Sequence, residues 1–167
     1  MDKILAAKLS PYAHLSTRKF PTDAGLDLYN YSPGEYSVVH PFTFKVLQTG
    51  ITIEIPKGYM GQIWPKSGSD YLVGGGIIDS GYQGEILVKI YNGWDTELIF
   101  QHGTAIAQLV LVPVITPAVV EVNRDEIHQI KTARGSTGGI VKGYSQLSYW
   151  DIDDLDWKED YNEELVK

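Results

Sequence analysis

Residues 74–85 read Gly-Gly-Gly-Ile-Ile-Asp-Ser-Gly-Tyr-Gln-Gly-Glu and set one carboxylate, Asp79, and one aromatic ring, Tyr82, on a glycine-rich hairpin. Glycine permits backbone angles that are closed to other residues, and its lack of a Cβ atom lets a ligand approach main-chain N–H and C=O groups. An apolar strand, 86–91, follows at once. One face of it carries Ile86, Val88 and Ile90, and the other carries Glu85, Leu87 and Lys89. The stretch therefore predicts a site loop supported directly by a β-strand.

Strand patterns dominate the rest of the chain. Short apolar or alternating runs occur at 4–9, 26–29, 42–48, 51–55, 60–64, 85–91, 97–100, 105–114 and 119–122. Glycine and proline separate these runs, as short loops between strands require, and no long helical period is present. Many short strands at regular spacing favour an all-β sandwich or jelly roll over a parallel α/β sheet.

The composition limits the classes of function. A chain of 167 residues with 43% hydrophobic content is long enough for one domain plus a tail. It contains no cysteine, and its four histidines lack metal-ligand spacing, which argues against disulfides and thiolate metal sites. No apolar run reaches membrane-spanning length and no signal peptide opens the chain. We expect no membrane association and a cytoplasmic location. If the source is eukaryotic or viral, the expected location is the nucleus or the cytoplasm of the host cell.

The charge is concentrated at the C-terminus. Residues 151–167 hold eight acidic and two basic residues, a net charge of −6, out of −7 for the whole chain. The remainder is nearly neutral and has no basic cluster, so no nucleic-acid partner is expected. The acidic tail also carries Trp157 and Tyr161, and it is interpreted either as a solvated, disordered arm or as a segment that docks on a neighbouring subunit.

Taken alone, Asp79 and Tyr82 also fit an ordinary turn, in which the aspartate bonds its own backbone. Four further motifs change this interpretation: Asp-Ala-Gly-Leu-Asp-Leu at 23–28, Pro-Lys-Ser-Gly at 65–68, Gly-Thr-Ala-Ile-Ala-Gln-Leu at 103–109 and Arg-Gly-Ser-Thr-Gly at 134–138. Each is weak by itself. In this order, over about residues 4–139, the five motifs resemble the trimeric dUTPase family.

The resemblance implies an architecture. It predicts a distorted jelly-roll β-barrel that assembles as a homotrimer with three shared active sites and a swapped C-terminal arm. The expected organisation is a dUTPase-like β domain at 1–133, an arm with a phosphate-binding motif at 134–150, and the acidic aromatic tail at 151–167. The implied reaction is the hydrolysis of dUTP to dUMP and pyrophosphate by attack of water at the α-phosphorus.

The resemblance also assigns roles. Asp79 matches the aspartate that orients or deprotonates the attacking water, and Ser67 matches the serine that bonds the oxygen bridging the α- and β-phosphorus. Asp27 matches the residue that holds Mg²⁺ through water. Tyr82 would pack on the deoxyribose and disfavour a ribose, and Gln108 would bind phosphate.

The remaining substrate contacts follow in the same way. The backbone of Gly75, Gly76 and Ile78 would read uracil, and Lys66 and Gly68 flank Ser67 in its motif. The arm would close over the γ-phosphate with the side chains of Arg134, Ser136 and Thr137 and the backbone of Gly135 and Gly138. Tyr144 is the candidate to stack on uracil, because the usual aromatic of the last motif is missing.

Other positions depart from the family pattern. Lys66 stands where arginine is usual, so the charge is kept but the planar fork is lost. Thr104 and Ala105 replace a common acid and base. The loop from Ser67 to Asp79 is a few residues shorter than usual, and the shortening would delete a helical turn at a subunit contact.

Two other functions fit parts of the sequence. A dCTP deaminase shares the fold, but it needs a glutamate where this chain has Lys89, which disfavours deamination. A non-enzymatic nucleotide-binding regulatory protein, with the acidic tail as its contact, is the alternative from a different class. An assay of pyrophosphate release from dUTP separates these possibilities.

Overall fold

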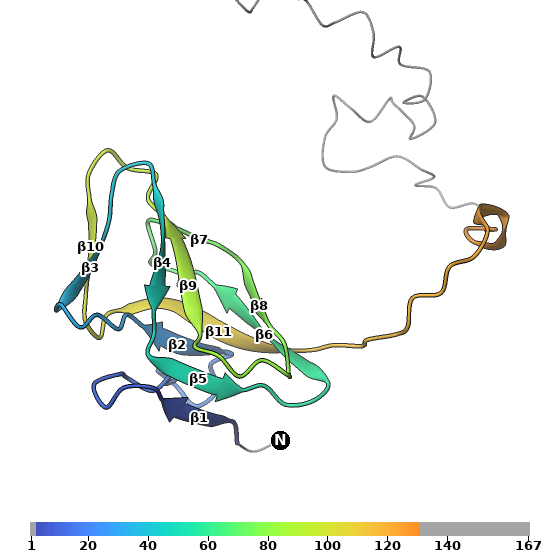
Figure 1. The fold of residues 1–167 in the computed structure, drawn as a ribbon, viewed down its shortest axis with the longest axis horizontal. Helices are drawn as coiled ribbons and strands as arrows, with labels where there is room; N and C mark the ends of the chain where they lie inside the picture. The colour runs from blue at the N-terminus through green and yellow to red at the C-terminus, as the bar shows by residue number, and fades with distance from the viewer. Residues whose placement is uncertain (1–2, 131–167) are drawn as a thin grey trace, which may run out of the picture. The chain divides into compact units, whose positions relative to one another are not determined.

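The computed structural model describes residues 3–130 of the 167-residue chain, and this part is built from antiparallel strands (Figure 1). The strands are β1 (Leu5–Lys8), β2 (Gly25–Tyr29), β3 (Tyr36–Val39), β4 (Phe44–Gln48), β5 (Ile51–Glu54), β6 (Tyr59–Trp64), β7 (Leu72–Val73), β8 (Gly76–Ile78), β9 (Leu87–Tyr91), β10 (Leu98–Gln101) and β11 (Ala105–Pro113). Within residues 3–130 the one helical element is a 3-10 turn, η1 (Arg124–Glu126). The prediction of an all-β fold is confirmed for this part of the chain.

The strands form four antiparallel sheets. A four-stranded sheet has the order β2-β11-β6-β8, and a three-stranded sheet has the order β4-β9-β7. β1 pairs with β5, and β3 lies beside β10, as Figure 1 shows. Neighbours in these sheets are far apart in sequence, so the fold depends on long-range pairing.

The core lies between the inward faces of the sheets. Ile86, Val88 and Ile90 are fully buried, whereas Leu87, Lys89 and Tyr91 are exposed, as the period of two predicts. Val88 lies opposite Leu47 of β4, which is also buried. The predicted faces of this strand are therefore correct.

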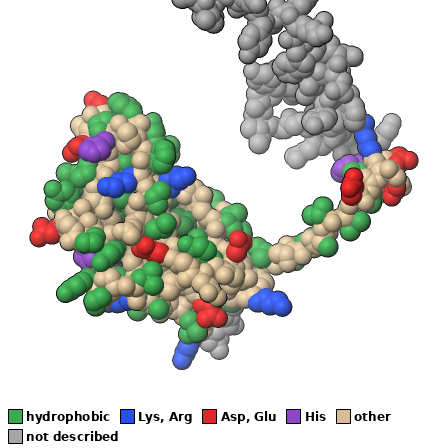
Figure 2. Space-filling model, viewed as in Figure 1, with side chains coloured by type: hydrophobic (Ala, Val, Ile, Leu, Met, Phe, Trp, Pro, Cys, Tyr) green, Lys and Arg blue, Asp and Glu red, His purple; other side chains and the backbone are tan. Residues whose placement is uncertain are grey.

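Apolar side chains also reach the surface. In the view of Figure 2, hydrophobic side chains lie between scattered acidic and basic ones. Phe44 and Leu72, which flank Tyr91 on the outer face of β4-β9-β7, are 66% and 67% exposed. Exposed apolar area of this kind is common on a chain that associates with others.

Residues 118–130 belong to a separate unit, because contacts divide the chain into Met1–Pro117 and Ala118–Lys167. The predicted strand at 119–122 is wrong. This segment has no ladder partner among residues 3–130, and Val119 is 98% exposed. A β-branched composition favours extended backbone, but a strand also needs a neighbour to receive its hydrogen bonds. None of the helices in the described range is long and apolar enough to cross a membrane.

The glycine-rich hairpin is closed by β7 and β9. Leu72 and Val73 pair with Tyr91 and Ile90, and the amide of Gly74 donates to the carbonyl of Lys89 over 2.8 Å. Inside this hairpin the short strand β8 pairs with β6, so the segment also joins two sheets. The alternation of each arm predicts a strand, but it does not specify which other strand will pair with it.

Candidate active site

Two predicted site positions, Asp27 and Gln108, lie side by side on β2 and β11, next to β6. Gln108 of β11 lies opposite Asp27 on β2 and opposite Trp64 on β6. The side chains of Leu26 and Leu28 enter the core, so Asp27 between them points outward. The three residues form one row across the outer face of the sheet.

The motif at 65–68 joins this row because it directly follows β6. The ammonium of Lys66 makes an ion pair with the carboxylate of Asp27. The side-chain amide of Gln108 donates a hydrogen bond of 2.9 Å to the carbonyl of Pro65. The structure thus brings together Asp27, Lys66, Ser67 and Gln108, which we call the Asp27 cluster.

Gly25 makes this arrangement possible, and its role was missed in the sequence. A Cβ atom built on Gly25 would lie 2.0 Å from Oε1 of Gln108. Any larger residue would therefore displace the glutamine that holds the Pro65 carbonyl. The sequence contained a signal of this role, because a glycine inside a strand often marks the close approach of another group.

The turn of the glycine-rich segment sets Asp79 and Tyr82. The amide of Tyr82 donates to the carbonyl of Asp79 over 3.0 Å, which closes a tight turn. The Tyr82 hydroxyl donates to the carbonyl of Glu85 over 2.8 Å. A Cβ on Gly84 would lie 2.5 Å from that hydroxyl, so glycine is required for this ring position. With its hydroxyl occupied, Tyr82 presents an aromatic face to a ligand.

Glu85 anchors the end of this segment. Its carboxylate accepts hydrogen bonds from the backbone of Gly50, at 2.7 Å, and from the side chain of Gln48, at 3.3 Å. The next residue, Ile86, is fully buried and bonds the carbonyl of Ile51. The turn is therefore fixed to the core a few residues after Tyr82.

The other arm of the segment, β8, is an edge strand. The four-stranded sheet ends with it, so the N–H and C=O groups that point away from β6 have no ladder partner in residues 3–130. Gly75 has no atom within 4 Å of a built Cβ, whereas Gly76 packs on Ile63. An edge of this type offers a flat polar ring both donors and acceptors.

Asp79 and the Asp27 cluster lie toward opposite ends of β6. Ile78 pairs with Gly61 near the start of the strand, and Lys66 follows its end. Asp79 therefore lies level with Met60, four residues from Trp64, which corresponds to about 13 Å along a strand. One chain does not bring Asp79 and Tyr82 to the Asp27 cluster.

In the Asp27 cluster and in the glycine-rich segment, the side chains expected to take part in the reaction are accessible to solvent. Ser67 and Asp79 are exposed, and neither side chain has a hydrogen bond or ion pair with residues 3–130. Two pockets of about 500 and 490 Å³ lie elsewhere, around Tyr31 with His102 and around His14 with Tyr29. Neither of these two pockets is lined by Asp79 or Ser67.

Several predicted contacts lie outside the described residues. These are Arg134, Gly135, Ser136, Thr137, Gly138 and Tyr144. Gly68 is described, and a Cβ at this position would meet no atom within 4 Å. Space for a ligand beside Ser67 is therefore present.

The Asp27 cluster contains one carboxylate group, that of Asp27, which could contact a metal ion. No group of three His, Cys, Asp or Glu side chains suited to a metal occurs in residues 3–130. A single carboxylate, already paired with Lys66, cannot form a protein cage for a divalent cation. It fits an ion held mainly by water and by a ligand's phosphates, as Mg²⁺ prefers.

Comparison with known proteins identifies the family of this chain. The dUTPase family model matches residues 11–138. A deoxyuridine 5'-triphosphate nucleotidohydrolase of fowlpox virus is 35% identical over 83% of this chain and 95% of its own length. The enzyme of the same name from Hydrogenobaculum sp. is 40% identical over 71% of this chain and 85% of its own length.

Solved structures give the same result. The dUTPase of Staphylococcus bacteriophage 80alpha, solved as a mutant with dUpNHpp, superposes with a TM-score of 0.73 at 26% identity. The match covers 83% of this chain and 97% of the phage chain. Sequence motifs, family model and fold therefore agree, and the chain belongs to the dUTPase family.

Proposed function

We propose that this chain carries out the reaction of its family, the hydrolysis of dUTP to dUMP and pyrophosphate, in sites shared between copies of a homotrimer. The single observation that supports shared sites is the separation of Asp79 from the Asp27 cluster along β6. Groups about 13 Å apart cannot act together on one phosphate. A second copy can supply the missing half of each site.

Two surfaces support association of copies. Trp64 lies in the same row as Gln108, on the outer face of the sheet, and is 47% exposed. Ile77 of the edge strand lies on the same face and is 64% exposed. These apolar side chains adjoin the cluster that needs a partner. The exposed, unpaired valines at 119–122 are suited to extend a sheet of a neighbouring copy, as the swapped arm requires.

The chemistry divides between the two groups. Asp79 lies on an anchored turn with its carboxylate open, so it can hold and deprotonate a water aimed at the α-phosphorus. Ser67 then donates its hydroxyl to the oxygen that leaves with pyrophosphate. Lys66 and Gln108 fix the loop that carries Ser67 and add donors for the phosphates.

Recognition of the nucleotide uses the glycine-rich segment. The open edge at Gly75, Gly76 and Ile78 pairs with uracil, because main-chain donors and acceptors there lack a ladder partner. Cytosine would leave such groups unpaired. Tyr82 presents its ring to the sugar, and a ribose hydroxyl against this face would be crowded and unpaired.

Asp27 is the residue that would hold Mg²⁺ through its water ligands. When bound, the ion supplies positive charge that neutralises the triphosphate. Lys66 sets the position of the Asp27 carboxylate and limits how far it can move toward a cation. Asp27 would contact the ion through water, and the phosphates of a bound nucleotide would complete its ligands. The cytoplasmic location expected from the sequence stays a prediction.

A complementation experiment tests shared sites. Asp79→Asn and Ser67→Ala should each be inactive alone, because one lacks the base and the other the leaving-group contact. Unfolding and refolding an equal mixture should restore about a quarter of the parent activity, since one of four combinations of neighbouring copies gives an intact site. The same proteins mixed without unfolding form the control.

The substrate profile is measured in parallel. Pyrophosphate release should occur with dUTP and Mg²⁺, while dCTP, dTTP and UTP stay nearly unchanged. A refolded mixture with no activity above the sum of its parts would place each site within one chain. Ammonia release from dCTP would show a deaminase instead.

A further inference from the structure

The loop between β6 and β7 carries Lys66 and Ser67, and it has little support of its own. Within it, the amide of Ser69 bonds the carbonyl of Lys66 over 3.0 Å. The loop forms no helix, and Ser67 and Gly68 are exposed. A short exposed turn holds a hydroxyl in one place only when neighbouring elements fix it.

Trp94 provides the first of two supports from outside the loop. Its indole Nε1 donates a hydrogen bond of 2.8 Å to the carbonyl of Asp70. Trp94 lies between β9 and β10, so this bond joins the loop to a different part of the fold. The indole is half exposed, and this hydrogen bond is the polar contact that determines where its nitrogen points.

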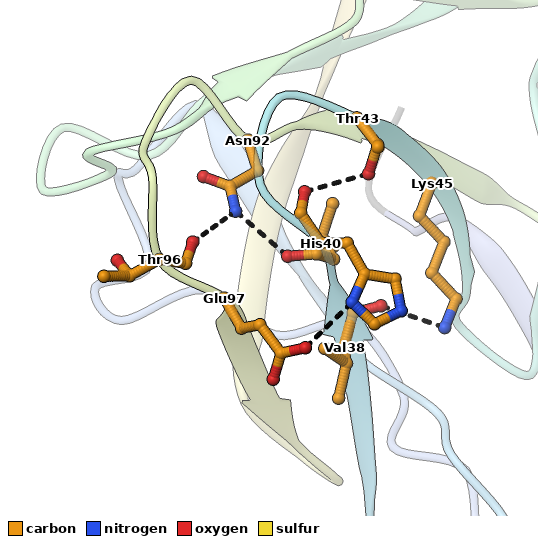
Figure 3. Close-up of polar contacts among 8 residues, drawn as sticks. Val38, His40, Thr43, Lys45, Asn92, Thr96 and Glu97 are labelled. Atoms are coloured by element: carbon orange, nitrogen blue, oxygen red, sulfur yellow. Dashed lines mark hydrogen bonds and ion pairs between the residues drawn. The ribbon is translucent and has the colours of Figure 1, made fainter.

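The position of Trp94 is set by a buried asparagine. Asn92 has no exposed surface, and its side-chain Oδ1 accepts a hydrogen bond of 3.0 Å from the backbone amide of Trp94. Its amide donates to the carbonyls of Thr96, at 2.7 Å, and Val39, at 3.0 Å. Figure 3 shows the hydrogen bond from the Asn92 side chain to Thr96, beside the His40–Glu97 pair. The turn that presents Trp94 is therefore fixed by a fully hydrogen-bonded core residue.

Tyr71 provides the second support. Its hydroxyl donates to the carbonyl of Ile106 on β11 over 3.0 Å. Its ring meets Phe100 of β10 edge to face, with centroids 5.0 Å apart. Burial raises the pKa of the Tyr71 hydroxyl, so it stays a hydrogen-bond donor. The loop is thus attached to β10 and β11 one residue after the Trp94 contact.

We propose that Trp94 and Tyr71 are positioning residues, which hold the 66–72 loop so that Ser67 and Lys66 are correctly placed for the triphosphate. These two contacts support a loop that has no helix of its own. Neither needs to touch the substrate, because both act on the loop through backbone carbonyls. The consequence for catalysis rests on the proposed function, while the structural role does not.

Hydrogen exchange tests the structural role. Trp94→Phe keeps an aromatic ring and removes the indole donor, and Tyr71→Phe removes only the hydroxyl. In each variant the peptide covering 66–72 should exchange at least about fivefold faster, while the peptide covering 74–85 stays as in the parent. Tyr12→Phe is the matched control, because its side chain is 75% exposed and lies away from this loop. Unchanged exchange of 66–72 in both variants would overturn the proposal.

Kinetics test the consequence. Both variants should lower kcat for dUTP about three- to tenfold with the Michaelis constant within about twofold, because base and sugar are read by the 74–85 segment. Faster exchange with an unchanged kcat would show that loop order does not serve the chemistry, which also overturns the positioning role. If the parent itself fails to hydrolyse dUTP, the proposed function is wrong, and the exchange result still decides the structural role. The variants remove different bonds, so each is an independent test if the other fails to fold.

Discussion

Lys66, just after the end of β6, makes an ion pair with Asp27 in the middle of β2, and both side chains are largely shielded from solvent, at 33% and 21% exposed. The pair places a cation of one motif on the carboxylate of another. A lysine ammonium is a point charge on a flexible stem, so it can hold one carboxylate oxygen without the two-pronged grip of an arginine. The Asp27 cluster therefore depends on this contact and on the bond from Gln108 to Pro65.

The first prediction follows from this pair. Lys66→Met should leave a partly buried carboxylate without its partner and release the Ser67 loop. We expect kcat/KM for dUTP to fall about ten- to a hundredfold, the loss typical when a partly buried charged partner is removed. Lys66→Arg should keep at least a third of the parent value, because the charge remains. Parent-like kinetics of Lys66→Met would show that the pair has no part in catalysis.

The second prediction concerns the base. Asp79→Asn keeps the shape of the side chain but cannot take a proton. Binding of dUMP and the oligomeric state should stay unchanged, while turnover of dUTP falls by about two to four orders of magnitude. Turnover within about threefold of the parent would mean that another group activates the water.

The third prediction uses the contact between Gly84 and Tyr82. A methyl group at position 84 would meet the Tyr82 hydroxyl at 2.5 Å, so Gly84→Ala should displace the ring. Preference for dUTP over UTP, measured as the ratio of the two kcat/KM values, should fall about five- to fiftyfold. Gly81→Ala is the matched control, because a Cβ there meets nothing within 4 Å. An unchanged ratio in Gly84→Ala would remove Tyr82 from sugar selection.

The fourth prediction is an alkaline limit of stability. Burial is the main cause that raises the pKa of Tyr71 above its ordinary value of 10.0. The folded state therefore holds the phenol proton more tightly than the unfolded state. This contribution to the free energy of unfolding is complete below the ordinary pKa and is lost as the pH rises through the raised value.

Urea unfolding checks this limit. Between pH of about 9 and 11 the free energy of unfolding should decline less steeply in Tyr71→Phe than in the parent. Tyr12→Phe should decline as the parent does. Parallel curves for the parent and Tyr71→Phe would show that the Tyr71 hydroxyl does not contribute to the pH dependence.

The fifth prediction concerns the C-terminal arm. If Tyr144 stacks on uracil, Tyr144→Ala should raise the Michaelis constant or cut turnover by the loss of one base–aromatic stack, about 1 to 3 kcal/mol. Truncation after Gly143 should have the same effect. Deletion of 151–167 should leave catalysis intact, because acidic residues repel a triphosphate. Loss of activity on deleting the tail, with no effect of Tyr144→Ala, would place the stacking aromatic at 150–157.

Much of the fold was predictable from local patterns. The strands at 51–55, 60–64 and 105–114 were expected within one residue of their observed ends, and the buried face of β9 was correct. β3, β7 and β8 were missed because they are short and carry little alternation, Leu72–Val73 being two residues long. The strand expected at 119–122 was wrong, since its composition alone cannot supply a neighbour.

The sequence by itself determined the family and the residue types of the site. Five motifs in one order identified a dUTPase, and the comparisons confirm it. Asp27, Lys66 and Gln108 were named as site residues from their motifs, and the structure brings them together. The exact roles of these residues stay predictions.

Only the tertiary structure decided how the site is divided. It showed that residues 74–85 join two sheets, that Asp79 lies at the opposite end of β6 from Lys66, and that Trp94 and Tyr71 hold the Ser67 loop. The physical reason is the range of the interactions. Turn chemistry and side-chain alternation are local and can be read from a few residues, whereas strand pairing and register join residues far apart in the chain and are set by the packing of the whole core.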